Sequence, residues 1–147
     1  MKNLVFILIF APFLLFSQSK EEMQDTYLSY LKSEGYTAEV TDAGNIKFKY
    51  EGNDYFLHSS DDEFYFEVFD YVNNDEGCSD RIKKLVTEVN GSYKTLTVYL
   101  IGDDCSSIKF ISSSILANKE DFRSVFKRSL SIVRLGKQKA QKLYSEN

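Results

Sequence analysis

The segment YTAEVTDAGNIKFKYEGNDYFLHSSDDEFYFEVFDYV, residues 36–72, determines the fold class of this 147-residue chain. It contains short runs rich in Phe, Tyr, Val and Ile, and most of them alternate apolar with polar side chains, as half-buried strands do. The turn sequences DAGN, EGND and SDDE separate these runs. Because such short connections join neighbouring antiparallel strands, we expect a four-stranded meander. Its strands are expected at residues 36–40, 46–50, 55–58 and 64–72.

Helical patterns precede and follow this meander. Residues 20–34 have helical spacing, and Ser79 or Asp80 begins a second helix that ends near Gly91. Two further strands are expected at residues 93–101 and 107–112, followed by a long last helix that begins at Asn118. In that helix, Gly136 is a position where it could end or bend. We therefore predict an α+β fold, an antiparallel β-sheet with helices packed on it in the order α-β-β-β-β-α-β-β-α, rather than a doubly wound nucleotide-binding fold.

The first nineteen residues have the composition of a secretory signal. Lys2 is followed by Leu4–Phe16, thirteen residues without a charge, which is too short to cross a membrane comfortably. Cleavage after Ser17 or Ser19 would fit the preference for small residues at the cleavage site. We expect residues 1–19 to be a signal peptide and residues 20–147 to be a single exported domain, periplasmic or secreted, with no stable membrane span after cleavage. The alternative is an uncleaved N-terminal anchor.

The charge distribution argues against nucleic acid as a ligand. Residues 18–118 contain nine basic and 19 acidic side chains, whereas residues 119–147 contain eight basic and three acidic ones. Nucleic-acid binding needs clustered Lys and Arg, and the body of the chain is acidic. The basic C-terminal segment could touch anionic lipid or an acidic partner, or could simply be the solvated face of a helix.

No pattern of catalytic, cofactor-binding or metal-ligating residues is present. The single histidine, His58, lies inside a predicted strand, and no pair of His or Cys residues has metal-ligand spacing. Carboxylates cluster at Asp61-Asp62-Glu63, Asp75-Glu76 and Asp103-Asp104, all in predicted turns, where Asp commonly makes local hydrogen bonds. We therefore expect a non-enzymatic protein without a cofactor or a metal.

The two cysteines, Cys78 and Cys105, are expected to form a disulfide. A chain bound for an oxidising compartment more often bridges such a pair than leaves it free. The helix that follows Cys78 runs away from it, and the next strand returns toward Cys105, so both cysteines come to lie in loops at the same end. The alternative is two small buried side chains with free thiols.

Aromatic residues are abundant, with ten Tyr, twelve Phe and no Trp. In the strand at 64–72, Phe64, Phe66 and Val68 lie on one face, and the other face carries further aromatic side chains: Tyr65, Phe69 and Tyr71. A sheet with one solvated face should show polar residues at alternate positions. The second face is therefore covered either by the last helix or by a partner.

Residues 20–135 resemble the YbjN-like proteins, which share the topology of type III secretion chaperones. The similarity lies in the hairpin DAGNIKFKYEG (42–52), the aromatic strand DDEFYFEV (61–68) and the helix entry NKEDFRSVFKRSL (118–130). The resemblance implies no catalytic residues, and the chaperone relatives act as dimers that hold extended polypeptide. We therefore expect an exported protein-binding or chaperone-like module. A protein partner and a homodimer are both compatible with this expectation. The alternative is a small exported hydrolase or ligand-binding protein that uses the turn carboxylates.

Overall fold

The computed structural model describes residues 20–59, 65–116 and 121–146. The predicted signal segment 1–19, the predicted cap Asn118 and the carboxylates Asp61, Asp62 and Glu63 lie outside this described part. Nine elements follow one another in the predicted order, which confirms the α+β class. They are α1 (Lys20–Ser33), β1 (Ala38–Val40), β2 (Ile46–Tyr50), β3 (Asn53–Ser59), β4 (Tyr65–Asn73), α2 (Asp80–Asn90), β5 (Leu96–Ile101), β6 (Ser107–Ile115) and α3 (Phe122–Glu146).

The six strands form one antiparallel sheet in the order β1-β2-β3-β4-β6-β5. The first four strands are the predicted meander, since each pairs with its neighbour in the sequence. The next strand in space is β6, which pairs with β4 over the whole length of both strands. This leaves β5 at one edge of the sheet and the three-residue β1 at the other.

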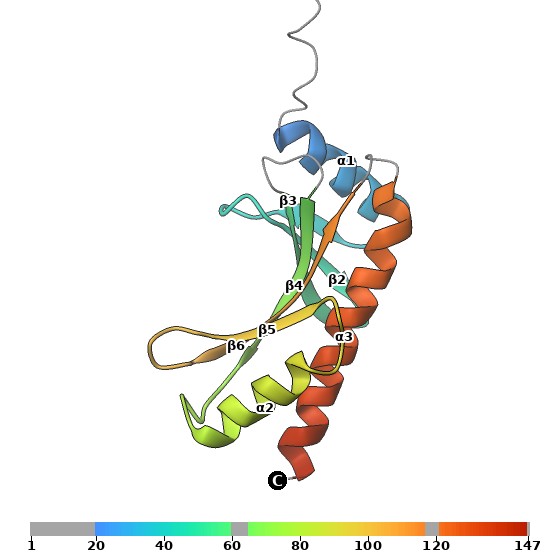
Figure 1. Ribbon diagram of the computed structural model, residues 1–147. Helices are drawn as coiled ribbons and strands as arrows, with labels where there is room; N and C mark the ends of the chain where they lie inside the picture. Colours follow the sequence, from blue (N-terminus) through green and yellow to red (C-terminus); the bar gives the residue numbers. More distant parts are fainter. Residues whose placement is uncertain (1–19, 60–64, 117–120, 147) are drawn as a thin grey trace, which may run out of the picture.

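The three helices pack on one face of the sheet and enclose the core (Figure 1). Helix α1 contacts β1, β2 and β3, α3 contacts β4, β5 and β6, and α2 packs against β5 and α3. Alternate strand residues point toward these helices because side chains in a strand have a period of two. The largest fully buried side chains are aromatic: Tyr27, Phe48, Phe66, Phe110, Phe122 and Phe126.

Helix α2 begins and ends as its sequence predicts. The Ser79 side chain accepts a hydrogen bond from the Ile82 backbone N–H at 3.3 Å, which satisfies a donor that has no partner within the helix. Ile82, Leu85 and Val89 form the buried stripe, and Gly91 is the C-cap.

The structure changes one strand boundary and excludes one of two alternatives for the last helix. The strand expected to begin at Tyr93 begins at Leu96. Helix α3 continues through Gly136 to Glu146, so it does not end at this glycine. Gly136 is buried against β5, and a Cβ atom at this position would lie 2.6 Å from Leu96 Cδ2. This glycine therefore permits close approach of α3 to the sheet, a role that depends on a residue forty positions away.

Candidate functional site

The sheet face opposite the helices carries a cluster of ring side chains around one lysine. We call this surface the aromatic face and define it by Phe56, Phe69, Tyr71, Tyr99 and Lys109. These residues come from β3, β4, β5 and β6, at strand positions that alternate with the core positions. The predicted alternation is therefore correct over residues 65–72, whereas Phe64 lies outside the described residues, and α3 lies on the Phe66 face and not on the Phe69 face.

The rings of this face support one another across the strands. Phe56 and Phe69 are partners in the β3–β4 register, and their rings stack with centroids 5.3 Å apart and planes 12° apart. The Tyr71 ring packs edge-on against both, at 5.8 Å from Phe56 and 5.5 Å from Phe69. Because these neighbours cover it, Phe69 is only 3% exposed although it lies on the face without helices. Such contacts hold the rings of this surface in fixed positions relative to one another.

Lys109 is held among three of these rings. Its Nζ lies 4.1 Å from the Phe69 centroid, 5.5 Å from that of Tyr71 and 5.9 Å from that of Tyr99. A cation over aromatic ring faces is stabilised by the ring quadrupoles. Tyr71 and Tyr99 are each 40% exposed, so the rim of this surface is open to contact.

His58 lies on the same side of the sheet but has no catalytic arrangement among the described residues. Its Nδ1 lies 2.9 Å from the Asn45 side-chain oxygen, and its strand partner is Glu67. The Glu67 carboxylate accepts hydrogen bonds from the Tyr65 and Ser113 hydroxyls at 2.5 and 3.2 Å. These are structural hydrogen bonds on the sheet surface rather than a nucleophile–base pair.

Two of the described acidic turn residues, Glu76 and Asp104, have separate structural partners. Glu76 forms an ion pair with Arg81 at 2.7 Å. Hydrogen bonds from the Ser106 side chain and backbone lower the pKa of Asp104, because they stabilise its carboxylate. Within the described residues, no group of three or more His, Cys, Asp or Glu side chains is placed to hold a metal ion.

The structure brings Cys78 and Cys105 together as a disulfide with a Cα–Cα distance of 5.1 Å. Cys78 precedes the N-cap of α2, and Cys105 lies in the turn between β5 and β6. The buried Asn74 fastens the same two loops, because its side-chain amide donates to the Gly77 carbonyl at 2.8 Å and to the Cys105 carbonyl at 2.6 Å. The loops are thus joined twice, once covalently and once by hydrogen bonds.

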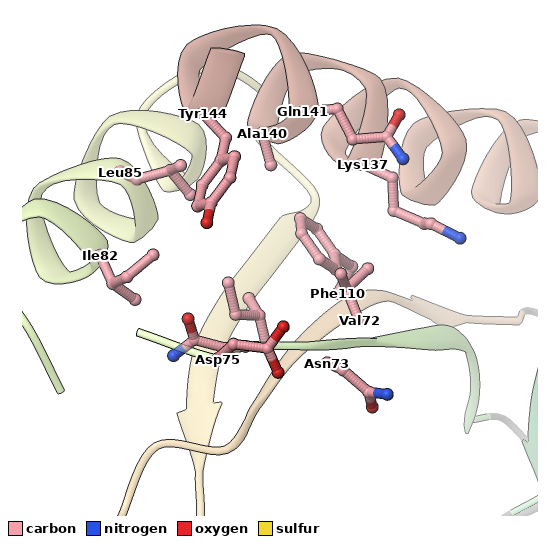
Figure 2. A pocket seen from close by; sticks show the side chains of 12 residues that line it. Val72, Asn73, Asp75, Ile82, Leu85, Phe110, Lys137, Ala140, Gln141 and Tyr144 are labelled. Atoms are coloured by element: carbon pink, nitrogen blue, oxygen red, sulfur yellow. The ribbon is translucent and has the colours of Figure 1, made fainter. Parts of the chain in front are cut away.

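A cavity lies on the helix side of the sheet, between α2, α3 and the ends of β4 and β6. Its volume is about 280 Å³. The wall is mostly apolar, formed by Val72, Ile82, Leu85, Ile108, Phe110 and Ala140 (Figure 2). Asp75, Gln141 and Tyr144 add polar groups to the lining. The sequence predicts the apolar stripes of both helices, but the space between them depends on how the helices are placed on the sheet.

A buried ion pair adjoins this cavity. The Lys137 ammonium donates to the Asp70 carboxylate, and the two side chains are only 13% and 6% exposed. The Tyr71 backbone N–H also donates to Asp70 Oδ1, at 2.6 Å. Burial raises the pKa of Asp70, and the neighbouring Lys137 ammonium and Tyr71 N–H oppose that rise. Sequence reasoning missed this pair, although an Asp on the core side of an aromatic strand was a usable signal.

Comparison with known proteins gives a structural similarity without a close sequence relative. No family model matches the chain. No curated protein matches it either. Among solved structures, YbjN from E. coli, a proposed transcription regulator, matches 77% of this chain and 87% of its own, with a TM-score of 0.62 and 12% identity. The fold is therefore YbjN-like, as the sequence resemblance predicts.

Proposed function

We propose that the chain is an exported, non-enzymatic module that binds an extended protein segment on its aromatic face. The observation that carries this proposal is the preformed ring cluster around Lys109 on the sheet face away from the helices. The YbjN-like fold is consistent with a binding module.

The chemistry of the face indicates what such a segment would contain. Exposed Tyr rings at interfaces provide large, rigid contact areas, and the rings here surround a cation. Lys47 and Lys49 add positive charge on the same side, although Lys47 is paired with Asp54 at 2.9 Å. A partner segment with apolar side chains and a carboxylate would match this surface, with its carboxylate near Lys109.

Addition of a strand to the sheet edge is a less favourable mode. At the β5 edge, the Asn90 side chain donates to the Val98 carbonyl and accepts from the Val98 N–H, both at 2.6 Å. These bonds occupy both backbone groups of Val98, in the middle of β5, which an added strand would need. The other edge strand, β1, has only three residues. Contact across the face is therefore favoured over edge pairing.

The proposal predicts site-specific crosslinking from the aromatic face. A photoreactive benzoylphenylalanine replacing Tyr71 or Tyr99 is expected to crosslink to a protein in the native host. The same replacement at Leu135, which is 40% exposed on α3, is the control and should give no such product. Mass spectrometry of the product separates a foreign partner from a second copy of the chain, which would make the face a homodimer contact. Equal products from all three positions, or none from the face, would contradict the proposal.

Export predicts a processed N-terminus. The intact protein from its native host is expected to begin at Gln18 or Lys20, because Leu4–Phe16 has the length and apolarity of a signal segment. Intact-mass spectrometry measures this directly. A Leu8→Arg variant is the control, since a charge inside the apolar run should block processing. A mature wild-type protein that retains residues 1–16 would show that the segment is an anchor instead.

The hydrolase alternative depends on the turn carboxylates. Of these, Glu76 is paired with Arg81 and Asp104 accepts a hydrogen bond from Ser106, so neither supports it. The ligand-binding alternative is favoured by a separate observation, the cavity on the helix side that is lined in part by Asp75.

A further inference from the structure

The cavity between α2, α3 and the sheet has the size and lining of a small-molecule site. Its 280 Å³ is close to the lower end of the range for ligand pockets, which is about 300 Å³. An apolar cavity of about 150 Å³ is enough to hold benzene, so this one could hold an apolar body roughly twice as large. Figure 2 shows Ile82 and Leu85 of α2 facing Ala140 and Tyr144 of α3 across the same space.

The charged side chains around this cavity differ in whether they already have an ion-pair partner. Lys137 is already paired with the buried Asp70, and in Figure 2 its amine points away from the space. Arg81 is held by Glu76 at 2.7 Å and by the Tyr144 carbonyl at 2.5 Å, and its guanidinium lies over the Tyr144 ring. Both cations near the cavity are therefore engaged and are poorly placed to receive an anionic ligand.

Asp75 is the exception. It lines the cavity, is exposed to solvent and forms no ion pair within the described residues. An exposed carboxylate at the border of an apolar cavity can pair with the positive charge of a ligand whose apolar body fills the cavity.

We propose that this cavity binds a small amphipathic amine, with its apolar body between α2 and α3 and its ammonium on the Asp75 carboxylate. This site is independent of the aromatic face, because the two lie on opposite sides of the sheet. Failure of either proposal would leave the other intact.

Three probes with the same eight-carbon chain test the proposal: octylamine, 1-octanol and octanoate. Isothermal titration calorimetry at concentrations where all three are monomeric is expected to show the order octylamine, then octanol, then octanoate. Asp75→Asn should lower the octylamine affinity by about three- to tenfold and leave the octanol affinity unchanged, because only the amine interacts with the lost charge. Asp25→Asn is the matched control, since Asp25 is an exposed residue of α1, at the far end of the molecule from α2 (Figure 1).

The Ala140→Leu variant tests whether the probes bind inside this cavity. Ala140 is 7% exposed and lines the cavity, so a larger side chain should fill the space and abolish binding of octylamine and octanol. Far-UV circular dichroism and thermal unfolding verify that this variant is folded, and Ala140→Val is a milder filling variant if it is not. A Tyr71→Ser/Tyr99→Ser variant should bind as the wild type does. Octanoate binding as tightly as octylamine, an unchanged preference in Asp75→Asn, or no binding by any probe would overturn the proposal.

Discussion

Replacing Lys137 by methionine is expected to lower the free energy of unfolding by about 3–5 kcal/mol at neutral pH. The substitution keeps the length and apolar character of the side chain but removes the ammonium that neutralises Asp70. With both side chains almost fully buried, solvent cannot replace the lost partner. A loss of this size is a large part of the stability of an ordinary single domain.

The pH dependence identifies the cause of the loss. In the wild-type protein burial already raises the pKa of Asp70, and Lys137 opposes that rise. Without Lys137 the folded-state pKa rises further above the unfolded value of about 3.9. A carboxyl group with a raised folded pKa is not penalised below its unfolded pKa, and its penalty grows as the pH rises through the folded pKa. The cost of Lys137→Met should therefore be smallest near pH 4 and largest at neutral pH.

Urea unfolding between pH 4 and pH 8 measures this dependence. Lys142→Met is the matched control on the same helix, and because the Lys142 side chain is 73% exposed it should cost less than about 1 kcal/mol. The double variant Lys137→Met/Asp70→Asn should recover most of the loss, because no charge is then left buried. A cost independent of pH, or no recovery in the double variant, would show that Lys137 acts through packing of its methylene groups.

Removal of the Cys78–Cys105 disulfide is expected to lower the free energy of unfolding by about 3.5 kcal/mol. The bridge closes a loop with a sequence separation of 27, and the loop-entropy relation gives about this value. The reduced protein should still fold, because the hydrogen bonds from Asn74 hold the same two loops together. We therefore expect lower stability with an unchanged circular dichroism spectrum.

Guanidinium unfolding of the protein with and without reductant measures this effect. The Cys78→Ala/Cys105→Ala variant should match the reduced wild type and should not respond to reductant. Thiol titration of unreduced, denatured protein collected from the cell envelope provides an independent check. Two free thiols per chain would contradict the presence of the bridge in the mature protein.

Short-range sequence patterns were sufficient to predict the helices, the strands and the sheet face on which each strand side chain lies. The alternation in residues 64–72 placed Phe66 and Val68 in the core and Phe69 and Tyr71 on the opposite face. The cap at Ser79 and the buried stripe of α2 also followed from spacing alone. Each of these features depends on residues within a few positions of one another, whose side-chain directions follow from the backbone geometry.

The candidate sites depend on contacts between distant parts of the chain. Lys137 meets Asp70 across 67 positions, and Gly136 is the point of α3 that Leu96 of β5 approaches closely. The cavity beside Asp75 lies where residues of α2, α3 and the ends of β4 and β6 come together. Amino-acid order sets the periodicity of each element, but the distance between two elements is the result of all the side chains packed between them. The sequence thus determined the fold class, the strand faces and the caps of α2, whereas packing alone decided the buried ion pair, the cavity and which sheet face is left without helices.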